Sequence, residues 1–186
     1  VIGNDPSKIY GQLNANGRVY LINPNGILFG SGAQVNVGGL VASTLDVDDD
    51  SLGSNKRRFV GSSKASVVVE KGASIVADGG GAGPGGAGGE VVLLGHQVIN
   101  QGRIAARLGM VALGGGNDIT LDFQGDGLLS LVVNRNELDA QARNGGVIQA
   151  DGGVVLLSAG ARDSLLASVV NNNGIIQAQS VQEREG

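Results

Sequence analysis

Short apolar runs separated by turn residues dominate the chain, and the stretch from Gly17 to Gly39 shows this pattern clearly. It contains the runs 19–22, 27–29 and 34–37, each ended by Asn, Gly, Pro or Ser residues. Such runs, rich in β-branched residues and bounded by turn residues, are typical of strands and tight corners. Three of them with tight corners predict one coil of a three-sided parallel β-helix. A hairpin meander gives similar local signals, so the rest of the chain has to decide.

An internal repeat favours the β-helix. A short element with a glycine, an isoleucine and an alanine recurs four times, and a second apolar element follows it at 91–95, 110–114 and 154–158. Aligning the final alanines of the first element places four isoleucines in equivalent positions: Ile75, Ile104, Ile148 and Ile176. Stacked repeats bury a core that no single repeat can bury alone. We therefore expect these isoleucines to point inward.

Asparagines stand just before three of the repeats, at Asn100, Asn144 and 171–173. In a parallel β-helix each strand bonds to the strands one coil above and below, about 4.8 Å away. Side chains at equivalent corners can then bond along the stack, and these asparagines fit that position. Because parallel crossovers are nearly always right-handed, the prediction is an all-β, right-handed parallel β-helix.

Three segments interrupt the repeat. The first, about 46–65, is charged and rich in turn residues. The second, about 117–135, has two alternating runs around Gly125-Asp126-Gly127 and predicts a β-hairpin that packs on the outside of the helix. The third, 81–90, separates ADGG from VVLL, two elements that are joined at 150–157, and predicts a flexible glycine-rich insertion at a corner. Residues 1–186 are thus predicted to be a single β-helical domain with these excursions.

Composition supports a narrow aliphatic interior. Hydrophobic residues make up 41% of the 186 residues but aromatic residues only 3%, and glycine occurs 34 times. The absence of cysteine excludes disulfides and a thiol nucleophile. A net charge of −4 gives no support for nucleic-acid binding. The sequence contains no run of about 18 apolar residues, so it predicts no membrane-spanning helix.

Residues 22–47, INPNGILFGSGAQVNVGGLVASTLDV, resemble the core of the secretion (haemagglutination-activity) domain of two-partner secretion exoproteins. These are the filamentous-haemagglutinin-like adhesins, haemolysins and contact-dependent toxins of Gram-negative bacteria. The similarity extends through 4–21 and the downstream repeats, and thus over nearly the whole chain. The family's NPNGI signature stands at Asn23, Pro24, Asn25, Gly26 and Ile27.

Two departures from the family pattern are visible. The family's N-terminal cap and its earlier NPNL motif are missing because the chain starts too late, so we expect an excised or mature fragment. The insertion at 81–90 is also atypical.

The resemblance implies a non-enzymatic role without cofactor or metal. We expect the secretion domain of a large exported adhesin-like exoprotein, a monomer that crosses the periplasm and is secreted to the cell surface or medium. Its expected partner is an outer-membrane transporter whose periplasmic POTRA domains bind it, while the β-helix grows outside the cell. The NPNGI turn has two interpretations: a structural corner of the first full coil, or a segment that the transporter reads directly.

Two other functional classes remain open. A module that binds host-cell or matrix glycans would use an exposed strand face. A polysaccharide-active enzyme would need carboxylates that converge on one face. The repeat strands offer only Asp151, at a corner, and the alternation of Asp118 and Asp122 with apolar residues predicts a solvent-facing side of the hairpin.

Three further motifs receive structural interpretations. The acidic run 46–50 could bind calcium, but it lacks the glycine and glutamate of an EF-hand loop, and a solvated loop is expected. The basic triplet 56–58 is likewise expected in a solvated loop. His96, the only histidine, is expected at a coil corner.

Overall fold

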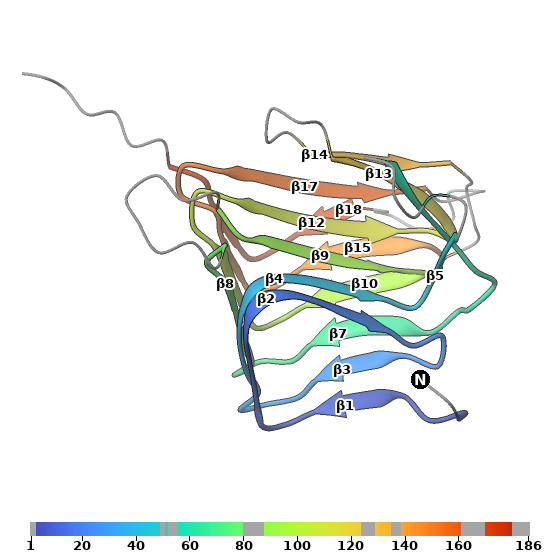
Figure 1. Cartoon of the computed structure of the whole chain (residues 1–186), viewed down its shortest axis with the longest axis horizontal. Coiled ribbons are helices and arrows are strands. Elements are labelled where there is room, and N and C mark those ends of the chain that lie inside the picture. The colour runs from blue at the N-terminus through green and yellow to red at the C-terminus, as the bar shows by residue number, and fades with distance from the viewer. Residues whose placement is uncertain are drawn as a thin grey trace, which may run out of the picture.

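The computed structural model describes residues 3–48, 51, 56–79, 88–123, 129–134, 139–160 and 170–179. These residues form the predicted right-handed parallel β-helix, whose coils stack from the N-terminal end upward (Figure 1). The first coil consists of β1 (Ser7–Ile9) and β2 (Gln12–Ile22), and the second of β3 (Ile27–Phe29) and β4 (Gln34–Ser43).

The later coils contain three strands each until the last. The third coil has β7 (Ser66–Val69), β8 (Ser74–Ala77) and β9 (Glu90–Gly95), and the fourth has β10 (Gln97–Asn100), β11 (Arg103–Ala106) and β12 (Met110–Gly115). The fifth has β15 (Gln141–Asn144), β16 (Val147–Gln149) and β17 (Val154–Ala159), and a partial sixth has β18 (Val170–Asn172) and β19 (Ile175–Gln177).

The helix has three faces, although two of them share strands. The first face is the six-stranded sheet β1-β3-β7-β10-β15-β18. The long strand β4 turns the corner between the other two, so that its residues 34–37 pair with β8 and its residues 39–43 pair with β9. At this corner a Cβ on Gly38 would lie 2.7 Å from the carbonyl oxygen of Asn16. Only glycine allows two coils to approach this closely.

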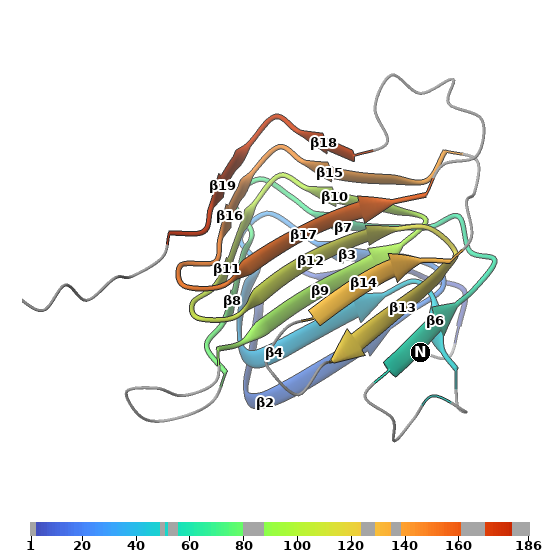
Figure 2. The ribbon, with the colours of Figure 1, turned by 90° about the horizontal axis from the view of Figure 1, so that it is seen from above.

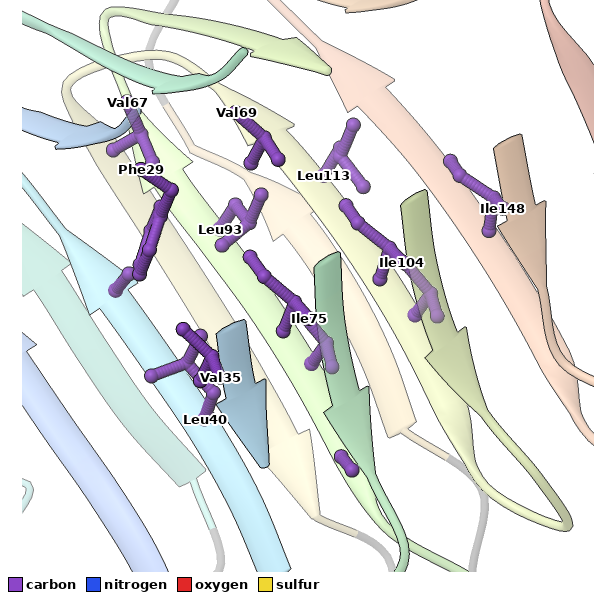
Figure 3. Packing of buried hydrophobic residues seen from close by; sticks show 14 of the residues in the cluster. Phe29, Val35, Leu40, Val67, Val69, Ile75, Leu93, Ile104, Leu113 and Ile148 are labelled. Carbon is purple, nitrogen blue, oxygen red and sulfur yellow. The ribbon is translucent and has the colours of Figure 1, made fainter. Parts of the chain in front are cut away.

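Inside the coils, aliphatic side chains at equivalent positions form ladders. Val35, Ile75, Ile104 and Ile148 are consecutive partners in register and are fully buried (Figure 3). Ile176 continues the ladder in register with Ile148, but its side chain is 37% exposed because no described strand lies beyond β19. The predicted inward ladder is therefore confirmed through Ile148, and Ile176 continues it in register with its side chain partly exposed.

A second ladder of asparagine amides runs along one corner, as predicted. Asn100 Nδ2 donates to Asn144 Oδ1 at 2.8 Å, and Asn144 Nδ2 donates to Asn172 Oδ1 at 2.8 Å. The Oδ1 atoms of Asn100 and Asn144 also accept from the backbone N–H groups two residues further on, at 3.1 and 3.3 Å. Each of these two amides thereby hydrogen-bonds both to the backbone of its own turn and to the asparagine of the next coil.

The two charged excursions form one structure outside the helix. The strands β5 (Asp46–Val47), β6 (Lys56–Val60), β13 (Asp118–Phe123) and β14 (Leu129–Val133) make an antiparallel sheet in the order β14-β13-β6-β5, which we name the outer sheet. It lies over the face formed by β4, β9 and β12 (Figure 2). A second core fills the space between them and includes Val41, Phe59, Val92, Ile119 and Leu121. The hairpin was predicted, but its pairing with the first excursion was not.

The basic triplet 56–58 is not the solvated loop that the sequence predicts. It forms most of β6, and each side chain has a partner. Lys56 Nζ lies 3.3 Å from Asp122 Oδ2, and the Arg57 guanidinium lies 5.2 Å from the Tyr20 ring centroid and donates to the Tyr20 hydroxyl. Arg58 donates to both carboxylate oxygens of Asp118, at 2.9 and 2.5 Å.

Asp118 does not belong to the solvent-facing side of the hairpin, because it is only 3% exposed. Its hydrogen bond to Arg58 and its negative charge raise the pKa of that arginine. Elsewhere on the helix surface, Glu90 is paired with Arg18. Burial raises the pKa of Glu90, while Arg18 and Arg57 lower it.

The register of β9 with β12 gives the glycine-rich insertion other boundaries than the sequence predicts. Residues 81–87 lie outside the described residues, but Gly89 and Glu90 do not belong to an insertion. Glu90 is the first residue of β9 and pairs with Met110, which in turn pairs with Val154. Before it, Gly79, Leu108 and Gly152 all have a positive φ, of 81°, 53° and 71°, as equivalent corner residues should. The inserted residues are therefore 80–88, and the predicted boundary at residue 90 is wrong.

Deleting residues 80–88 should leave the free energy of unfolding within about 1 kcal/mol of the parent, because closing a shorter loop changes the entropy only slightly. Deleting 81–90 is the matched control. It leaves β9 one residue short, which moves its side chains to the opposite face, and should cost at least about 2 kcal/mol. Urea unfolding followed by circular dichroism compares the two. Equal stability of both deletions would contradict the register given above.

The isoleucine ladder provides a second test with an internal control. Ile104→Ala should reduce the free energy of unfolding by about 2–5 kcal/mol, because it opens a cavity between two coils. Ile176→Ala changes the same position of the repeat where the side chain is partly in solvent, and should cost no more than about 1–2 kcal/mol. Both values come from denaturant titration, and a larger loss for Ile176→Ala would exclude the proposed difference in burial.

Candidate functional site

The NPNGI segment forms the corner between β2 and β3, where the first coil becomes the second. The backbone N–H of Gly26 donates to the carbonyl oxygen of Asn23 at 3.1 Å and closes the turn. Pro24 suits the second position of such a turn, because its ring fixes φ. Gly26 has a φ of 117°, which L side chains rarely adopt. The sequence therefore folds into this corner for local reasons.

Asn23 is fully buried and uses its whole amide. Its Oδ1 accepts from the backbone N–H of Asn25 at 2.9 Å and from the Asn25 amide at 3.2 Å. Its Nδ2 donates to the carbonyl oxygen of Asp5 at 3.0 Å and to Ser7 Oγ at 2.9 Å. A buried amide with four hydrogen bonds positions both its own turn and the chain that precedes β1.

The remaining residues of the motif divide into buried and exposed ones. Asn25 is half-buried and donates to the carbonyl oxygen of Gly3 at 2.8 Å. Gly26 and Ile27 are buried. The ring of Pro24 is exposed, while its carbonyl oxygen accepts a hydrogen bond from Ser63 Oγ. A partner that meets the folded corner could therefore contact Pro24 and part of Asn25, but not the other three residues.

An open groove of about 480 Å³ lies beside the corner. The corner residues Pro24 and Asn25 form one side, and Asp46, Ser62 and Ser63 are among those that form the rest. Sequence reasoning missed this groove, because it depends on the return of the first excursion to the corner. The hydrogen bond from Ser63 Oγ to the Pro24 carbonyl oxygen holds the end of the excursion beside the corner. No residue spacing in the sequence predicts this contact.

The other candidate residues do not converge on a catalytic or metal centre. Among the residues that the structure describes, no group of three or more His, Asp or Glu side chains could hold a metal ion. The calcium alternative falls partly on 49–50, outside the described residues. His96 lies at a corner as predicted, between β9 and β10, and is 3% exposed. In the described part of the chain, no helix combines the length and apolar character needed to cross a membrane.

Comparison with known proteins identifies the class. The model of the TPS secretion domain matches residues 1–186, so the chain belongs to the family of two-partner secretion domains. Such domains are parts of exoproteins that Gram-negative bacteria export across the outer membrane, which agrees with the secreted location expected from the sequence.

Two proteins of Haemophilus influenzae are similar to this chain. Over 189 residues, the chain is 36% identical to a heme/hemopexin-binding protein, matching all of this chain and 20% of that protein. The crystal structure of the HMW1 secretion domain superimposes with a TM-score of 0.76 at 30% identity, covering 98% of this chain and 44% of that one. The chain thus spans about a fifth of the length of its curated relative.

The bonds of Asn23 predict a structural cost that can be measured. Asn23→Ala should lower the free energy of unfolding by about 1–3 kcal/mol, because it leaves buried partners without hydrogen bonds. Pro24→Ala, at an exposed ring of the same turn, should cost less than about 1 kcal/mol. Thermal melting of both variants provides the comparison, and an unaffected Asn23→Ala variant would show that the corner tolerates loss of the amide.

Proposed function

We propose that residues 1–186 act as a single secretion domain of a large exported adhesin-like exoprotein. In this proposal a POTRA-containing outer-membrane transporter recognises the domain in the periplasm and exports it, and the domain then nucleates β-helix folding outside the cell. The observation that carries the proposal is the NPNGI corner, which joins the first two coils and the N-terminal turn in a chain of this family.

The coil geometry supports growth of the fold in chain order. Each coil after the first bonds its backbone to the coil that precedes it, and the inner ladders add one side chain at a time. Repeat structures of this kind are stabilised by contacts between neighbours, so a first folded coil can serve as the template for the next. Folding outside the cell would then oppose backward movement of the chain.

The exposure pattern at the corner favours recognition before folding. In the folded corner Asn23, Gly26 and Ile27 are buried, so a transporter that reads all five residues would have to meet them in an extended chain. We therefore propose that the segment has two successive roles, as a recognition sequence in the periplasm and as a corner after export.

A non-enzymatic role is part of the same proposal. The described repeat strands carry few acidic side chains, and the Asp151 carboxylate already accepts from the side-chain amide of Gln149 and from the backbone N–H of Gln179. The relatives' name includes heme and hemopexin binding. The present chain has one histidine, which is buried, and no cysteine.

The experiment is export of the chain from a Gram-negative host that produces it with or without its two-partner transporter. We expect the chain in the medium only with an intact transporter, and a transporter without its POTRA domains should abolish release. Release that does not depend on the transporter would overturn the proposal.

The two roles of the corner make a separate prediction. Asn23→Ala should reduce export by more than its loss of stability explains. A core variant of matched stability, such as Val98→Ala, should be exported nearly as well as the parent, because it leaves the motif unchanged. Equal export of the two variants at equal stability would show that the transporter does not read the asparagine.

A further inference from the structure

The outer sheet joins two parts of the chain that are far apart in sequence. β6 pairs with β5 through only two residues, Asp46 with Val60 and Val47 with Phe59. It pairs with β13 through five residues, from Lys56 with Asp122 to Val60 with Asp118. A two-stranded hairpin is at best marginally stable by itself. β6 therefore depends for most of its backbone pairing on a strand that follows about 60 residues later.

The charges of these strands meet in the same arrangement. Asp118 is buried, and its carboxylate accepts from Arg58 at 2.9 and 2.5 Å and from Asn134 Nδ2 at 2.9 Å. The Asn134 amide also donates to Thr120 Oγ1 at 2.7 Å. Burying a carboxylate without its partners is strongly unfavourable. The site is thus stable only when residues 58, 118 and 134 are all in place.

The second core depends on the same closure. Val41, Val92 and Ala112 point outward from the helix, and Phe59, Ile119 and Leu121 cover them from the outer sheet. All six side chains are fully buried in the closed structure. Without the outer sheet, coils two to four would present this apolar strip to water, at a cost that grows with the exposed area.

We propose that the outer sheet is a latch that closes only after residue 134 is available and then locks coils two to four together. The coils can stack in chain order, but β6 stays without its partner until β13 and Asn134 have followed it. This role rests on the proposed function, in which the chain is exported with its N-terminal end first. Closure of the outer sheet then covers the apolar strip of the stacked coils, and the closed stack opposes backward movement of the chain. The hydrogen bonds of Asp118 to Arg58 and Asn134 hold β6 and β13 together in the closed sheet.

Pulse-labelling hydrogen exchange during refolding of the full 186-residue chain tests the latch. Backbone amides of β4, β8 and β11 should become protected in a first phase, and those of β6 and β13 together in a later one. Asp118→Asn, which places amide hydrogens against Arg58, should slow the later phase about tenfold and leave the first within about twofold. The matched control is Asp122→Asn, whose partner Lys56 is 70% exposed, and it should change both phases by less than about twofold.

Two results would overturn the latch: protection of β6 together with β4 before β13, or an equal slowing of both phases by Asp118→Asn. Arg58→Gln provides a second variant, which should slow the later phase in the same way. An unchanged later phase in this variant would contradict the proposal. Refolding needs no transporter, so these outcomes stand even if the parent chain is not exported. Export of Asp118→Asn, several-fold below that of Asp122→Asn, would then connect the latch to secretion.

Discussion

Parallel pairing of the same short strand from coil to coil is the constraint on which the whole structure depends. Each strand has to meet its counterpart in register, because a shift of one residue exchanges the inner and outer side chains. The register from Val35 through Ile148 and the asparagine ladder from Asn100 to Asn172 satisfy this condition on two different sides of the coil. Both ladders require their residues at equal positions, so the repeat in the sequence and the repeat in space have one cause.

This cause explains why much of the fold was predictable. Local periodicity and the isoleucine alignment predict the coils, and the asparagines before the repeats predict the bonded corner. The repeat pattern misplaces the glycine-rich insertion because it matches Val91 with Met110, whereas β9 begins one residue earlier with a glutamate. The equivalents of Glu90 in the next two coils are the apolar residues Met110 and Val154. A glutamate is tolerated at this strand position because Arg18 lies beside it and pairs with its carboxylate.

The outer sheet and the surroundings of the corner could not be predicted in the same way. Pairing between β6 and β13 follows no repeat, since it depends on where two excursions return to the helix. One signal was present: the bases at 56 and 58, like the acids at 118 and 122, are an even number of residues apart and so lie on one side of a strand. Local reasoning assigned both sets to solvent, because each excursion was considered alone. The partners of Asn23 at Asp5 and Ser7 were equally invisible, although the importance of the motif itself was not.

The corner between Gly79 and Gly89 has a consequence beyond this chain. Gly79 has a positive φ, as Leu108 and Gly152 do, and β9 regains its register directly after Gly89, although nine residues intervene. The solenoid therefore separates the length of the chain from the spacing of its coils at this corner. A foreign peptide grafted there would be displayed on the outside of the β-helix while the hydrogen bonding of the neighbouring strands stays the same, which makes the corner a natural acceptor site for epitopes or tags.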